Sequence, residues 1–301
     1  MLTVIIPSYN DANNISLAIA SASKIKNVTE IIVIDDCSED NTEKLIRKLK
    51  FNEPRISYFK NKINLGTGLS FIKGIQKSST PYIILLNSDD FFIPNEMENL
   101  FNYVLKNNLD VGYGKMAIKK ETGIHKYSHP GYKNYSYINQ RDELQDLLIF
   151  DMYMPSFGTI IKREGLKKFY NAKYYKKLMC DYGGEFKAHD YDLFINLAKK
   201  RKKFGFLNEV VCIWCPKKES QSGENYFNSG ESCYESSFLF NKYSKNESFS
   251  KDTINLIYKR IKGKYNNKKK HQIKKDKFSF HYKNFLNKIN LLLDHNFQKK
   301  T

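Results

Sequence analysis

The residues of this chain best suited to chemistry are Asn87, Ser88, Asp89 and Asp90, which directly follow an apolar run. That run, Tyr82-Ile83-Ile84-Leu85-Leu86, is typical of a buried strand. Polar residues at the carboxyl end of such a strand lie where open α/β sheets bind ligands. Carboxylate oxygens are the ligands that a hard divalent cation prefers, and such a cation also binds phosphates. The segment therefore predicts a site for a metal ion and a phosphorylated ligand.

The same pattern, an apolar run followed by polar residues, occurs twice earlier in the chain. The run at 2–6, rich in β-branched side chains, is followed by Pro7-Ser8-Tyr9-Asn10. The run at 30–34 is followed by the two acids Asp35-Asp36. Three such segments indicate one shared site rather than three unrelated loops.

Helical segments are expected between these runs. Apolar residues recur at helical spacing within 14–26, and a second helix is predicted to begin at Asp40 or Asn41. A third strand at 56–59 leads into Asn64-Leu65-Gly66. Strands that alternate with helices predict an α/β fold with a mostly parallel sheet flanked by helices on both faces.

In their order and spacing, these segments resemble the family 2 inverting glycosyltransferases of the GT-A fold. The resemblance resumes at residues 188–193, Ala-His-Asp-Tyr-Asp-Leu, and covers roughly residues 1–215. It implies a Rossmann-like catalytic domain at 1–215, with a nucleotide-sugar half at 1–90 and an acceptor half at 91–215. A helical, basic extension is expected at 216–301. The segments that carry the resemblance are Pro7-Ser8-Tyr9-Asn10, residues 33–42, Asn64-Leu65-Gly66 and Asn87-Ser88-Asp89-Asp90.

A nucleotide base needs a flat surface and a directional partner, and Tyr9 and Asp36 offer these. The resemblance implies that Asp36 reads the uracil of a UDP-sugar and that Asp35 shapes the same loop. The alternative is that both acids only end the strand or cap a turn. The residues expected to bind the nucleotide sugar are Pro7, Ser8, Tyr9, Asn10, Asp35, Asp36, Asn64, Gly66, Asn87, Ser88, Asp90 and Lys217.

The diphosphate of the donor needs positive charge, for which Mn²⁺ or Mg²⁺ is expected. The resemblance implies that Asp89 is the main metal ligand, with Asp90 either compensating as a ligand or orienting the donor sugar. Asn87 replaces the first acid of the family motif, so it adds no negative charge and weakens the hold on the ion. Many relatives place an arginine near Phe71, and the neighbouring Lys73 is expected to point elsewhere on its helix.

The acceptor hydroxyl must lose a proton as it attacks, which one carboxylate accomplishes in an inverting transfer. Asp190 matches the acid of the family's Glu-Asp motif, with His189 in place of the Glu, and is the expected base. It is also expected to be the N-cap of a helix over 191–199, where an anion is favoured. Asp192 is the competing candidate for the base.

Two further regions are candidates for ligand contacts. Residues 112–155 are rich in tyrosine and histidine, which suits either an acceptor wall or a tyrosine-rich surface segment. Lys217 stands where relatives often show a histidine and is expected to neutralise phosphate, with Ser220 and Ser222 behind it.

The net charge of +18 is concentrated in the tail, because residues 258–301 hold fourteen Lys or Arg against two acids. Within it, large apolar residues recur from Phe278 to Phe297 at steps of three to five, which predicts an amphipathic helix. Such a helix suits an anionic membrane surface, and this is the favoured prediction. The alternative is a helix that packs on the rest of the protein. No nucleic-acid-binding module accompanies the lysines, so no nucleic-acid partner is predicted.

The location expected for the chain is cytoplasmic, peripheral on the inner face of the membrane. Five scattered cysteines are typical of reduced thiols, and no run of about twenty apolar residues predicts a membrane-spanning helix. The first strand begins at Leu2, which leaves no room for a signal peptide.

The resemblance implies transfer of a hexose or N-acetylhexosamine from a UDP-sugar to a hydroxyl. The Lys-, Asn- and Ile-rich composition, typical of an AT-rich bacterial genome, favours a surface glycan as the acceptor, either lipooligosaccharide or capsule. One alternative is a GT-A-fold nucleotidyltransferase, although Pro7-Ser8-Tyr9-Asn10 is not the glycine- and lysine-rich loop that such an enzyme needs. The other is a degenerate, membrane-associated, glycan-binding scaffold, which the changes at Asn87 and Phe71 would suit.

Overall fold

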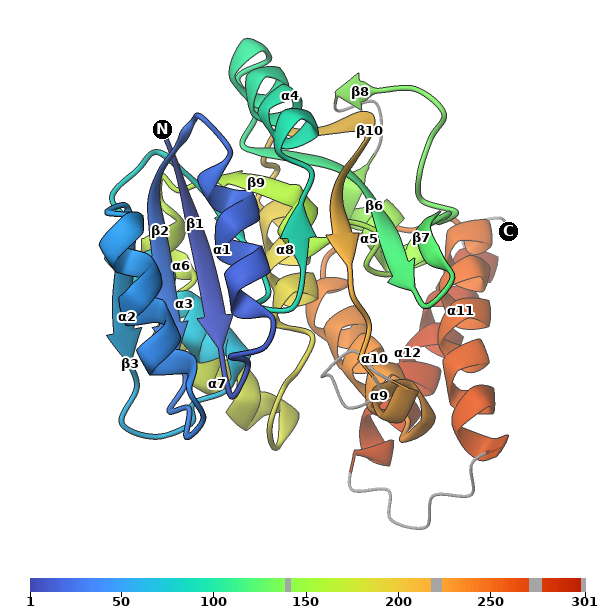
Figure 1. Ribbon diagram of the computed structural model, residues 1–301. Coiled ribbons are helices and arrows are strands. Elements are labelled where there is room, and N and C mark those ends of the chain that lie inside the picture. The colour runs from blue at the N-terminus through green and yellow to red at the C-terminus, as the bar shows by residue number, and fades with distance from the viewer. Residues whose placement is uncertain (139–141, 218–223, 271–277, 299–301) are drawn as a thin grey trace. The chain divides into compact units, whose positions relative to one another are not determined.

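The computed structural model describes residues 1–138, 142–217, 224–270 and 278–298 (Figure 1). The chain forms two compact units. Unit 1 consists of Met1–Gln140, Met154–Lys177 and Lys202–Cys215, and unit 2 of Arg141–Tyr153, Leu178–Arg201 and Pro216–Thr301.

The division expected at residue 215 differs from this partition. Two segments that precede residue 215 belong to unit 2, because their helices pack against C-terminal helices. Helix α5 (Glu143–Phe150) packs on α11 (Lys251–Lys270), and α8 (His189–Lys199) packs on α10 (Glu231–Tyr243).

Unit 1 is built on one mixed sheet whose path runs β3-β2-β1-β4-β9-β6-β10-β5, with β7 paired to β6 and β8 paired to β10. The strands are β1 (Leu2–Ser8), β2 (Val28–Asp35), β3 (Ile56–Lys60), β4 (Tyr82–Leu85), β5 (Phe91–Phe92), β6 (Val111–Lys120), β7 (Gly123–Lys126), β8 (Tyr137–Ile138), β9 (Thr159–Lys162) and β10 (Phe204–Trp214). Its helices are α1 (Ile15–Ser23), α2 (Thr42–Asn52), α3 (Thr67–Lys77), α4 (Pro94–Lys106) and α6 (Leu166–Phe169), with a 3₁₀ turn at Ser156–Gly158.

The four strands that precede the predicted motifs lie side by side and parallel, in the order β3-β2-β1-β4. Ser8 at the end of β1 is in register with Asp35 at the end of β2, which in turn is in register with Lys60 of β3. Their carboxyl ends therefore meet at one edge of the sheet. The α/β fold with a mainly parallel sheet flanked by helices is confirmed.

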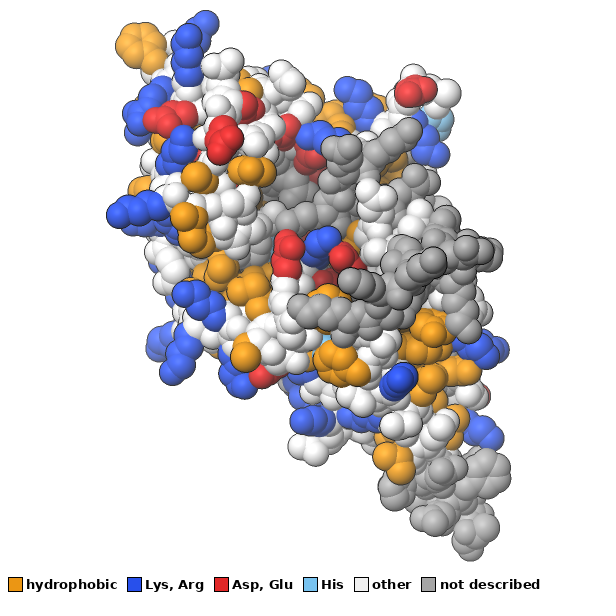
Figure 2. Space-filling view, turned by 90° about the horizontal axis from the view of Figure 1, so that it is seen from below, with side chains coloured by type: hydrophobic (Ala, Val, Ile, Leu, Met, Phe, Trp, Pro, Cys, Tyr) orange, Lys and Arg blue, Asp and Glu red, His pale blue; other side chains and the backbone are white. Residues whose placement is uncertain are grey.

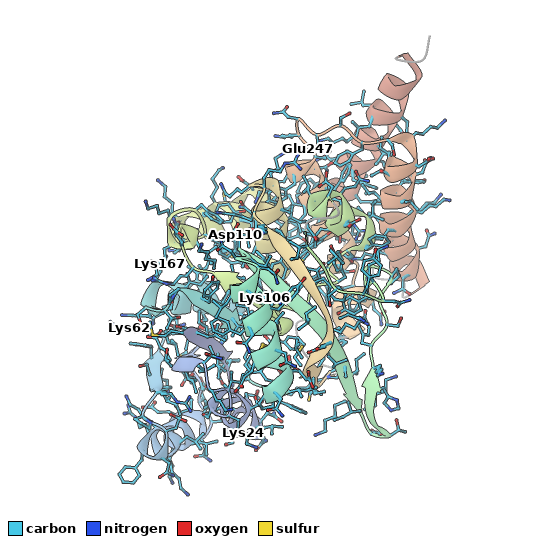
Figure 3. The ribbon with its side chains drawn as sticks, turned by 90° about the horizontal axis from the view of Figure 1, so that it is seen from above. Lys24, Lys62, Lys106, Asp110, Lys167 and Glu247 are labelled. Atoms are coloured by element: carbon cyan, nitrogen blue, oxygen red, sulfur yellow. The ribbon has the colours of Figure 1, made fainter. Side chains whose placement is uncertain are left out.

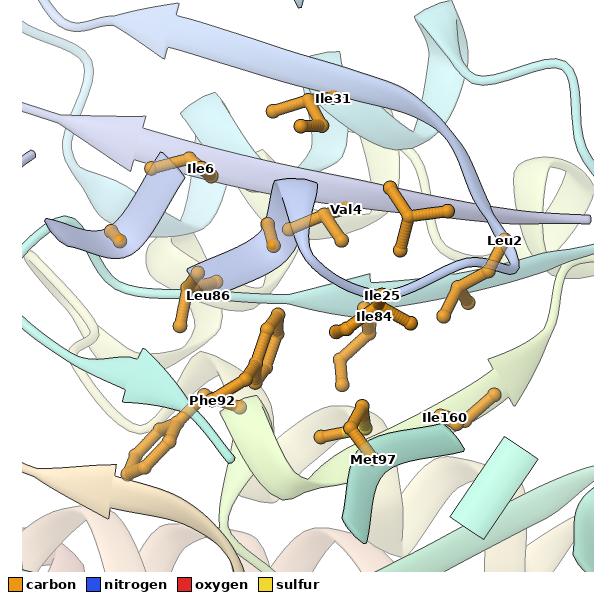
Figure 4. Close-up of a cluster of buried hydrophobic side chains, with 14 of the residues drawn as sticks. Leu2, Val4, Ile6, Ile25, Ile31, Ile84, Leu86, Phe92, Met97 and Ile160 are labelled. Atoms are coloured by element: carbon orange, nitrogen blue, oxygen red, sulfur yellow. The ribbon is translucent and has the colours of Figure 1, made fainter. Parts of the chain in front are cut away.

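Side chains along β1 point alternately to the two faces of the sheet, so alternate residues contact the helices on opposite sides. Leu2, Val4 and Ile6 join the buried cluster shown in Figure 4. Ile5 faces the other way, where a Cβ on Gly74 of α3 would come within 2.2 Å of its side chain. In Figure 1, α1 and α2 lie in front of these strands and α3 lies behind them. Each fully buried side chain of this kind contributes about 1.5–3 kcal/mol, so the cluster holds the strand ends in place.

Unit 2 is helical in its described residues. Besides α5, α8, α10 and α11, it contains α9 (Glu224–Asn228) and α12 (Ser279–Gln298). Helix α7 (Ala172–Tyr182) crosses the division between the units at residue 177. Figure 3 labels Glu247 in the connection between α10 and α11, where its carboxylate pairs with Lys199 of α8 at 2.9 Å. The unit is therefore held together by ion pairs as well as by apolar packing.

The apolar stripe predicted in the tail forms part of α12, and its described core is buried. Tyr282, Phe285 and Ile289 are 7%, 0% and 1% exposed, and α12 packs on α10 and α11. Exposed apolar side chains on this helix include Phe280 and Leu291. The amphipathic helix is thus present, but within unit 2 its apolar face is covered in the way that the packing alternative describes.

The basic side chains visible in Figure 2 are spread over the face shown rather than gathered into one patch.

Among the described helices, none combines the length and apolar character needed to cross a membrane. None of the five cysteines, all of which lie in described segments, takes part in a disulfide.

Candidate active site

Asp36, which directly follows β2, holds the loop that leads into α3. Its carboxylate accepts hydrogen bonds from the Asn61 side chain (2.7 Å) and from the backbone N–H groups of Leu65 (2.9 Å) and Gly66 (2.7 Å). It is 3% exposed. Gly66 adopts φ +82°, a conformation that glycine tolerates best, and so it turns the chain into α3. Asp36 therefore has the turn-holding role named as the alternative, and its contact with uracil stays a prediction.

Asp35, the last residue of β2, is fully buried and shapes the same loop. It accepts hydrogen bonds from the Ser38 N–H (2.8 Å) and from the Tyr58 hydroxyl (2.5 Å). Burial, together with this carboxylate, raises the pKa of Tyr58 above its ordinary value, so Tyr58 stays a hydrogen-bond donor. This agrees with the role in loop shaping expected for Asp35.

The segment after β1 presents an aromatic ring at the same edge. Tyr9 is 50% exposed, which leaves its ring available for stacking. Asn10, at φ +49°, donates its N–H to Ser38 and accepts from the Glu39 N–H. Ser8 is buried, and its Oγ makes no hydrogen bond among the described residues. The loops after β1 and β2 are therefore joined to one another directly.

In the loop after β4, two polar residues are buried and two are partly exposed to solvent. Asp90 is 1% exposed and accepts hydrogen bonds from the Asn87 amide (2.8 Å) and the Cys215 N–H (2.8 Å). Asn87 and Asp89 are partly exposed, whereas Ser88 is buried and donates to Asp11. These contacts give Asp90 a part in shaping the loop, while its action on the donor sugar stays a prediction.

Sequence reasoning missed two residues at this edge. Asp11 is 7% exposed and accepts from Asn14 (2.6 Å) and Ser88 (2.7 Å), which ties the start of α1 to the loop after β4. Asn61 follows β3 directly and joins Asp36 to α3. The rule that selected polar residues after the other strands would have found Asn61 as well, because β3 ends at the same edge.

Lys73 does not point away from this region as expected. Its ammonium donates to the Asn61 side-chain oxygen (2.5 Å), and the Asn61 amide in turn donates to Asp36. Phe71, in contrast, is 1% exposed and belongs to the core. Lys73 therefore brings a positive charge from α3 close to Asp36, with only the Asn61 side chain between them.

No group of three or more His, Cys, Asp or Glu suited to hold a metal ion occurs among the described residues. The loop after β4 offers one partly exposed carboxylate, Asp89, since Asp90 is buried and bonded to Asn87 and Cys215. This fits a Mg²⁺-type ion, which proteins commonly bind through one or two carboxylates together with substrate phosphates.

The two acids at the start of α8 in unit 2 differ sharply in surroundings. Asp192 is fully buried and accepts hydrogen bonds from Lys242 (2.8 Å) and the Tyr243 hydroxyl (2.7 Å). Asp190 is partly exposed and accepts from the Tyr191 N–H (2.9 Å). An ion-paired, buried carboxylate is poorly placed to take a proton from a substrate, so the surroundings favour Asp190 over Asp192 as the base.

The cap expected for this helix was wrong by two residues. Helix α8 begins at His189 with Ala188 as its N-cap, so Asp190 lies inside the first turn. An acid there is still favoured by the helix dipole. His189 is 6% exposed and its Nδ1 lies 3.0 Å from the Lys187 carbonyl oxygen, which indicates a structural role.

The remaining candidates are less well defined. Lys217 is exposed and belongs to unit 2, while Ser220 and Ser222 lie outside the described residues. Within the tyrosine-rich stretch of unit 1, Tyr113 and Tyr137 are buried and join their hydroxyls at 2.5 Å. These two rings belong to the core, which removes them from an exposed acceptor wall.

The edge of the sheet in unit 1 thus combines an exposed ring, a glycine turn at a helix start and one accessible carboxylate. Backbone N–H groups at a helix N-terminus favour anions, and an aromatic ring can stack on a nucleobase. This combination suits a nucleotide with a phosphate chain.

Comparison with known proteins agrees with this chemistry. Residues 3–169 match the protein-family model described as "Glycosyl transferase family 2". A β-1,3-glucosyltransferase of Escherichia coli, WfgD, which is named for UDP-Glc and α-D-GlcNAc-diphosphoundecaprenol, is 33% identical over 125 residues. That match covers 41% of this chain and 49% of WfgD, so the chain spans about half of that relative. An uncharacterised glycosyltransferase of Methanocaldococcus jannaschii is 26% identical over 70% of this chain and 69% of its own.

Solved structures share the fold at low sequence identity. S. aureus TarS residues 1–349 align with a TM-score of 0.67 at 16% identity, over 97% of this chain and 80% of that one. The same protein in complex with UDP-GlcNAc aligns with a TM-score of 0.63 at 18% identity, over 86% of this chain and 70% of that one. The mannosyltransferase PcManGT of Pyrobaculum calidifontis, in complex with GDP-Man and Mn²⁺, aligns with a TM-score of 0.56 at 13% identity, over 86% and 68%. The family match over more than half of the residues, on this fold, shows that the chain belongs to glycosyl transferase family 2.

Proposed function

We propose that this protein is an inverting glycosyltransferase that moves a hexose or N-acetylhexosamine from a UDP-sugar to a hydroxyl of a surface glycan. The observation that carries the proposal is the single edge of unit 1 at which four parallel strands end. That edge presents the exposed Tyr9, the Gly66 turn and Asp89. Structures of a fold relative with UDP and UDP-GlcNAc support a uridine donor.

The donor's diphosphate is proposed to bind with Mn²⁺ or Mg²⁺, held on the protein side by Asp89. The metal would neutralise the leaving UDP. The Mn²⁺ complex of the mannosyltransferase supports this choice of ion. Exposed Lys217 is the proposed second source of positive charge for the phosphates.

Asp190 is proposed as the general base that takes the proton from the acceptor hydroxyl. Its partial exposure and its place in the first turn of α8 support this role. The ion pair between Lys242 and the competing acid Asp192 supports this choice.

A lipid-linked glycan acceptor, on the way to lipooligosaccharide or capsule, is proposed from two observations. The curated E. coli relative is named for a diphosphoundecaprenol acceptor, and the lysine-rich residues 258–301 suit an anionic membrane surface. Because the apolar core of α12 is covered, contact with the membrane would rely on lysines and on exposed Phe280 and Leu291. The proposed location is therefore the inner face of the cytoplasmic membrane.

Two experiments test the proposal. The first is calorimetric titration with UDP, GDP and CDP in the presence of Mn²⁺, in which UDP should bind most tightly. Preferential binding of GDP would overturn the donor class. Asp89→Ala should abolish the dependence of UDP binding on Mn²⁺, with Glu39→Gln on an exposed loop as the matched control.

The second experiment measures turnover of UDP-glucose and UDP-N-acetylglucosamine by the wild type and by Asp190→Asn. Removing a general base should lower turnover by about 10²–10⁴-fold while UDP affinity stays the same. If Asp192→Asn is the inactive variant in a correctly folded protein and Asp190→Asn is active, the base is misassigned. Turnover that continues unchanged in excess EDTA would overturn the metal role.

A further inference from the structure

Glu235 is a buried carboxylate in the middle of α10 that the proposed transfer does not itself use. It is 1% exposed. Burying a carboxylate is costly unless hydrogen bonds compensate for the lost water. The three donors that compensate Glu235 therefore indicate what the residue holds.

Two of those donors lie at the start of α8. The carboxylate of Glu235 accepts the backbone N–H of Lys187 (2.7 Å) and that of Ala188 (3.0 Å). The third donor is the hydroxyl of Tyr226 in α9 (2.6 Å). Ala188 is the N-cap of α8. One side chain of α10 thus joins the beginning of α8 to α9.

A second contact fixes the same segment. The Lys187 ammonium pairs with Glu231, one turn earlier on α10, at 2.6 Å. Nδ1 of His189 lies 3.0 Å from the Lys187 carbonyl oxygen. The peptide groups that precede α8 are therefore held by α10 on two levels, and Asp190 follows directly in the first turn.

We propose that Glu235 is a positioning residue for the general base, fixing the start of α8 to α10 and thereby the place of the Asp190 carboxylate. This inference rests on the function proposed above. A base must lie within hydrogen-bond reach of the proton that it takes, so a small shift of the helix start is expected to lower the rate.

Glutamine at this position would have nearly the same volume but a different pattern of donors and acceptors. Its amide has one acceptor oxygen, whereas the carboxylate serves three donors from two oxygens. The NH₂ group of Glu235→Gln would face an N–H or O–H group and push it away. The variant therefore loosens the start of α8 without leaving a cavity.

The test is a double-mutant cycle on turnover of UDP-glucose and UDP-N-acetylglucosamine by the full chain with Mn²⁺, at a pH above the raised pKa of Glu235, about 7, so that the residue is a carboxylate. Glu235→Gln should lower kcat by about 10–100-fold, as expected for a misplaced catalytic group, with the KM for the donor unchanged. In the Asp190→Asn background the same substitution should cost nothing further, because residues that act as a unit are not additive. Asp252→Asn, at an exposed acid in the first turn of α11 in the same unit, is the control and should stay within about twofold of the wild type.

The possible results distinguish the positioning role of Glu235 from the assignment of Asp190 as the base. Wild-type kcat in Glu235→Gln, or a full additional loss in the Asp190→Asn background, would overturn the positioning role and leave the proposed transfer intact. Wild-type turnover in Asp190→Asn would overturn the assignment of the base, and the positioning role with it. If Glu235→Gln does not fold, Tyr226→Phe takes its place in the cycle. It removes one donor without adding another, and its smaller loss of kcat should likewise vanish without Asp190.

Discussion

In unit 1 the buried carboxylates of Asp35, Asp36 and Asp90 accept hydrogen bonds from neutral N–H and O–H groups. In unit 2 the partly exposed carboxylate of Asp151 pairs with lysine and arginine, and the buried carboxylate of Asp192 pairs with lysine. A neutral donor orients a carboxylate but leaves its negative charge, whereas a cation cancels that charge. The strand ends of unit 1 therefore keep the negative charge of these carboxylates, which the metal ion proposed above would offset for the diphosphate of the donor.

Not every acid of unit 2 is described by an ion pair: the buried Glu143 accepts from the Tyr153 hydroxyl, and Asp190 and Glu235 differ as well. Asp190 is partly exposed, and Glu235 is buried against two backbone N–H groups and a tyrosine. Asp190 lies in the first turn of α8, and Glu235 of α10 accepts hydrogen bonds from the two residues that precede that helix. Substitutions that separate these two kinds of carboxylate test whether the contrast between the units holds.

The largest effect is expected from Phe285→Ala in α12. Phe285 is fully buried, and replacing a core phenylalanine by alanine costs about 3–5 kcal/mol. Unfolding in urea, monitored by circular dichroism, measures the loss. Leu291→Ala, at a side chain that is 60% exposed, is the control and should change the free energy of unfolding by less than about 0.5 kcal/mol. An unchanged stability in Phe285→Ala, with weaker binding to anionic vesicles, would instead make the stripe a membrane anchor.

Asp151→Asn should destabilise unit 2 nearly as much. Burial opposes the charge on Asp151, but Lys264 and Arg260 outweigh it and hold the pKa of this carboxyl below its ordinary value. Removing the charge leaves the two cations uncompensated, and because Asp151 is 23% exposed the cost should lie at the lower end of the about 3–5 kcal/mol expected for a buried pair. The stabilisation should also disappear as the pH falls through the lowered pKa, because the native state must then bind the proton.

The control for Asp151 is Glu43→Gln in α2, whose pair with Arg47 is exposed to solvent. Its free energy of unfolding should not change measurably. Equal losses for Asp151→Asn and Glu43→Gln would contradict the view that ion pairs build unit 2.

Glu235 gives a pH dependence of the opposite sign. Burial raises the pKa of the Glu235 carboxyl from 4.5 to about 7. The hydrogen bonds from Tyr226 and Lys187 lower this pKa, and the charge of the neighbouring Glu231 raises it. The native state then holds a proton that the unfolded chain has lost, so its contribution to stability falls by about 3 kcal/mol between about pH 4.5 and 7. Subtracting the unfolding curve of Glu235→Gln from that of the wild type across this range isolates the effect. A flat difference would show that the folded-state pKa is ordinary.

The smallest effect on stability is expected in unit 1, from Asp36→Asn. The amide keeps the size of the side chain but loses part of its capacity to accept from Asn61, Leu65 and Gly66. One or two lost hydrogen bonds cost about 1–3 kcal/mol. Calorimetric titration should show weaker UDP binding, since the loop before α3 is no longer held. Full UDP affinity in a destabilised protein would limit Asp36 to the turn.

The strand ends of unit 1 could be predicted from local sequence. Each motif there follows directly from its own apolar run, and strands that alternate with helices must end at a common edge when they are parallel. Asp35, Asp36 and Asp89 could therefore be predicted as neighbours of the same edge from periodicity and local order. The resemblance of the motifs then supplied the family, which the match over residues 3–169 confirms.

Whether an acid is held in hydrogen bonds and ion pairs within the protein, in contrast, depends on contacts between distant segments. Asp190 and Asp192 are two residues apart and look equivalent in sequence, yet Asp192 meets Lys242, fifty positions away, at 2.8 Å. Glu235 meets Lys187 across forty-eight positions. Helix periodicity shows which face is apolar but not which helix covers it, and this is why α12 was predicted for a membrane although it packs on α10. Such contacts depend on how helices distant in sequence are brought together, and no local pattern encodes that choice.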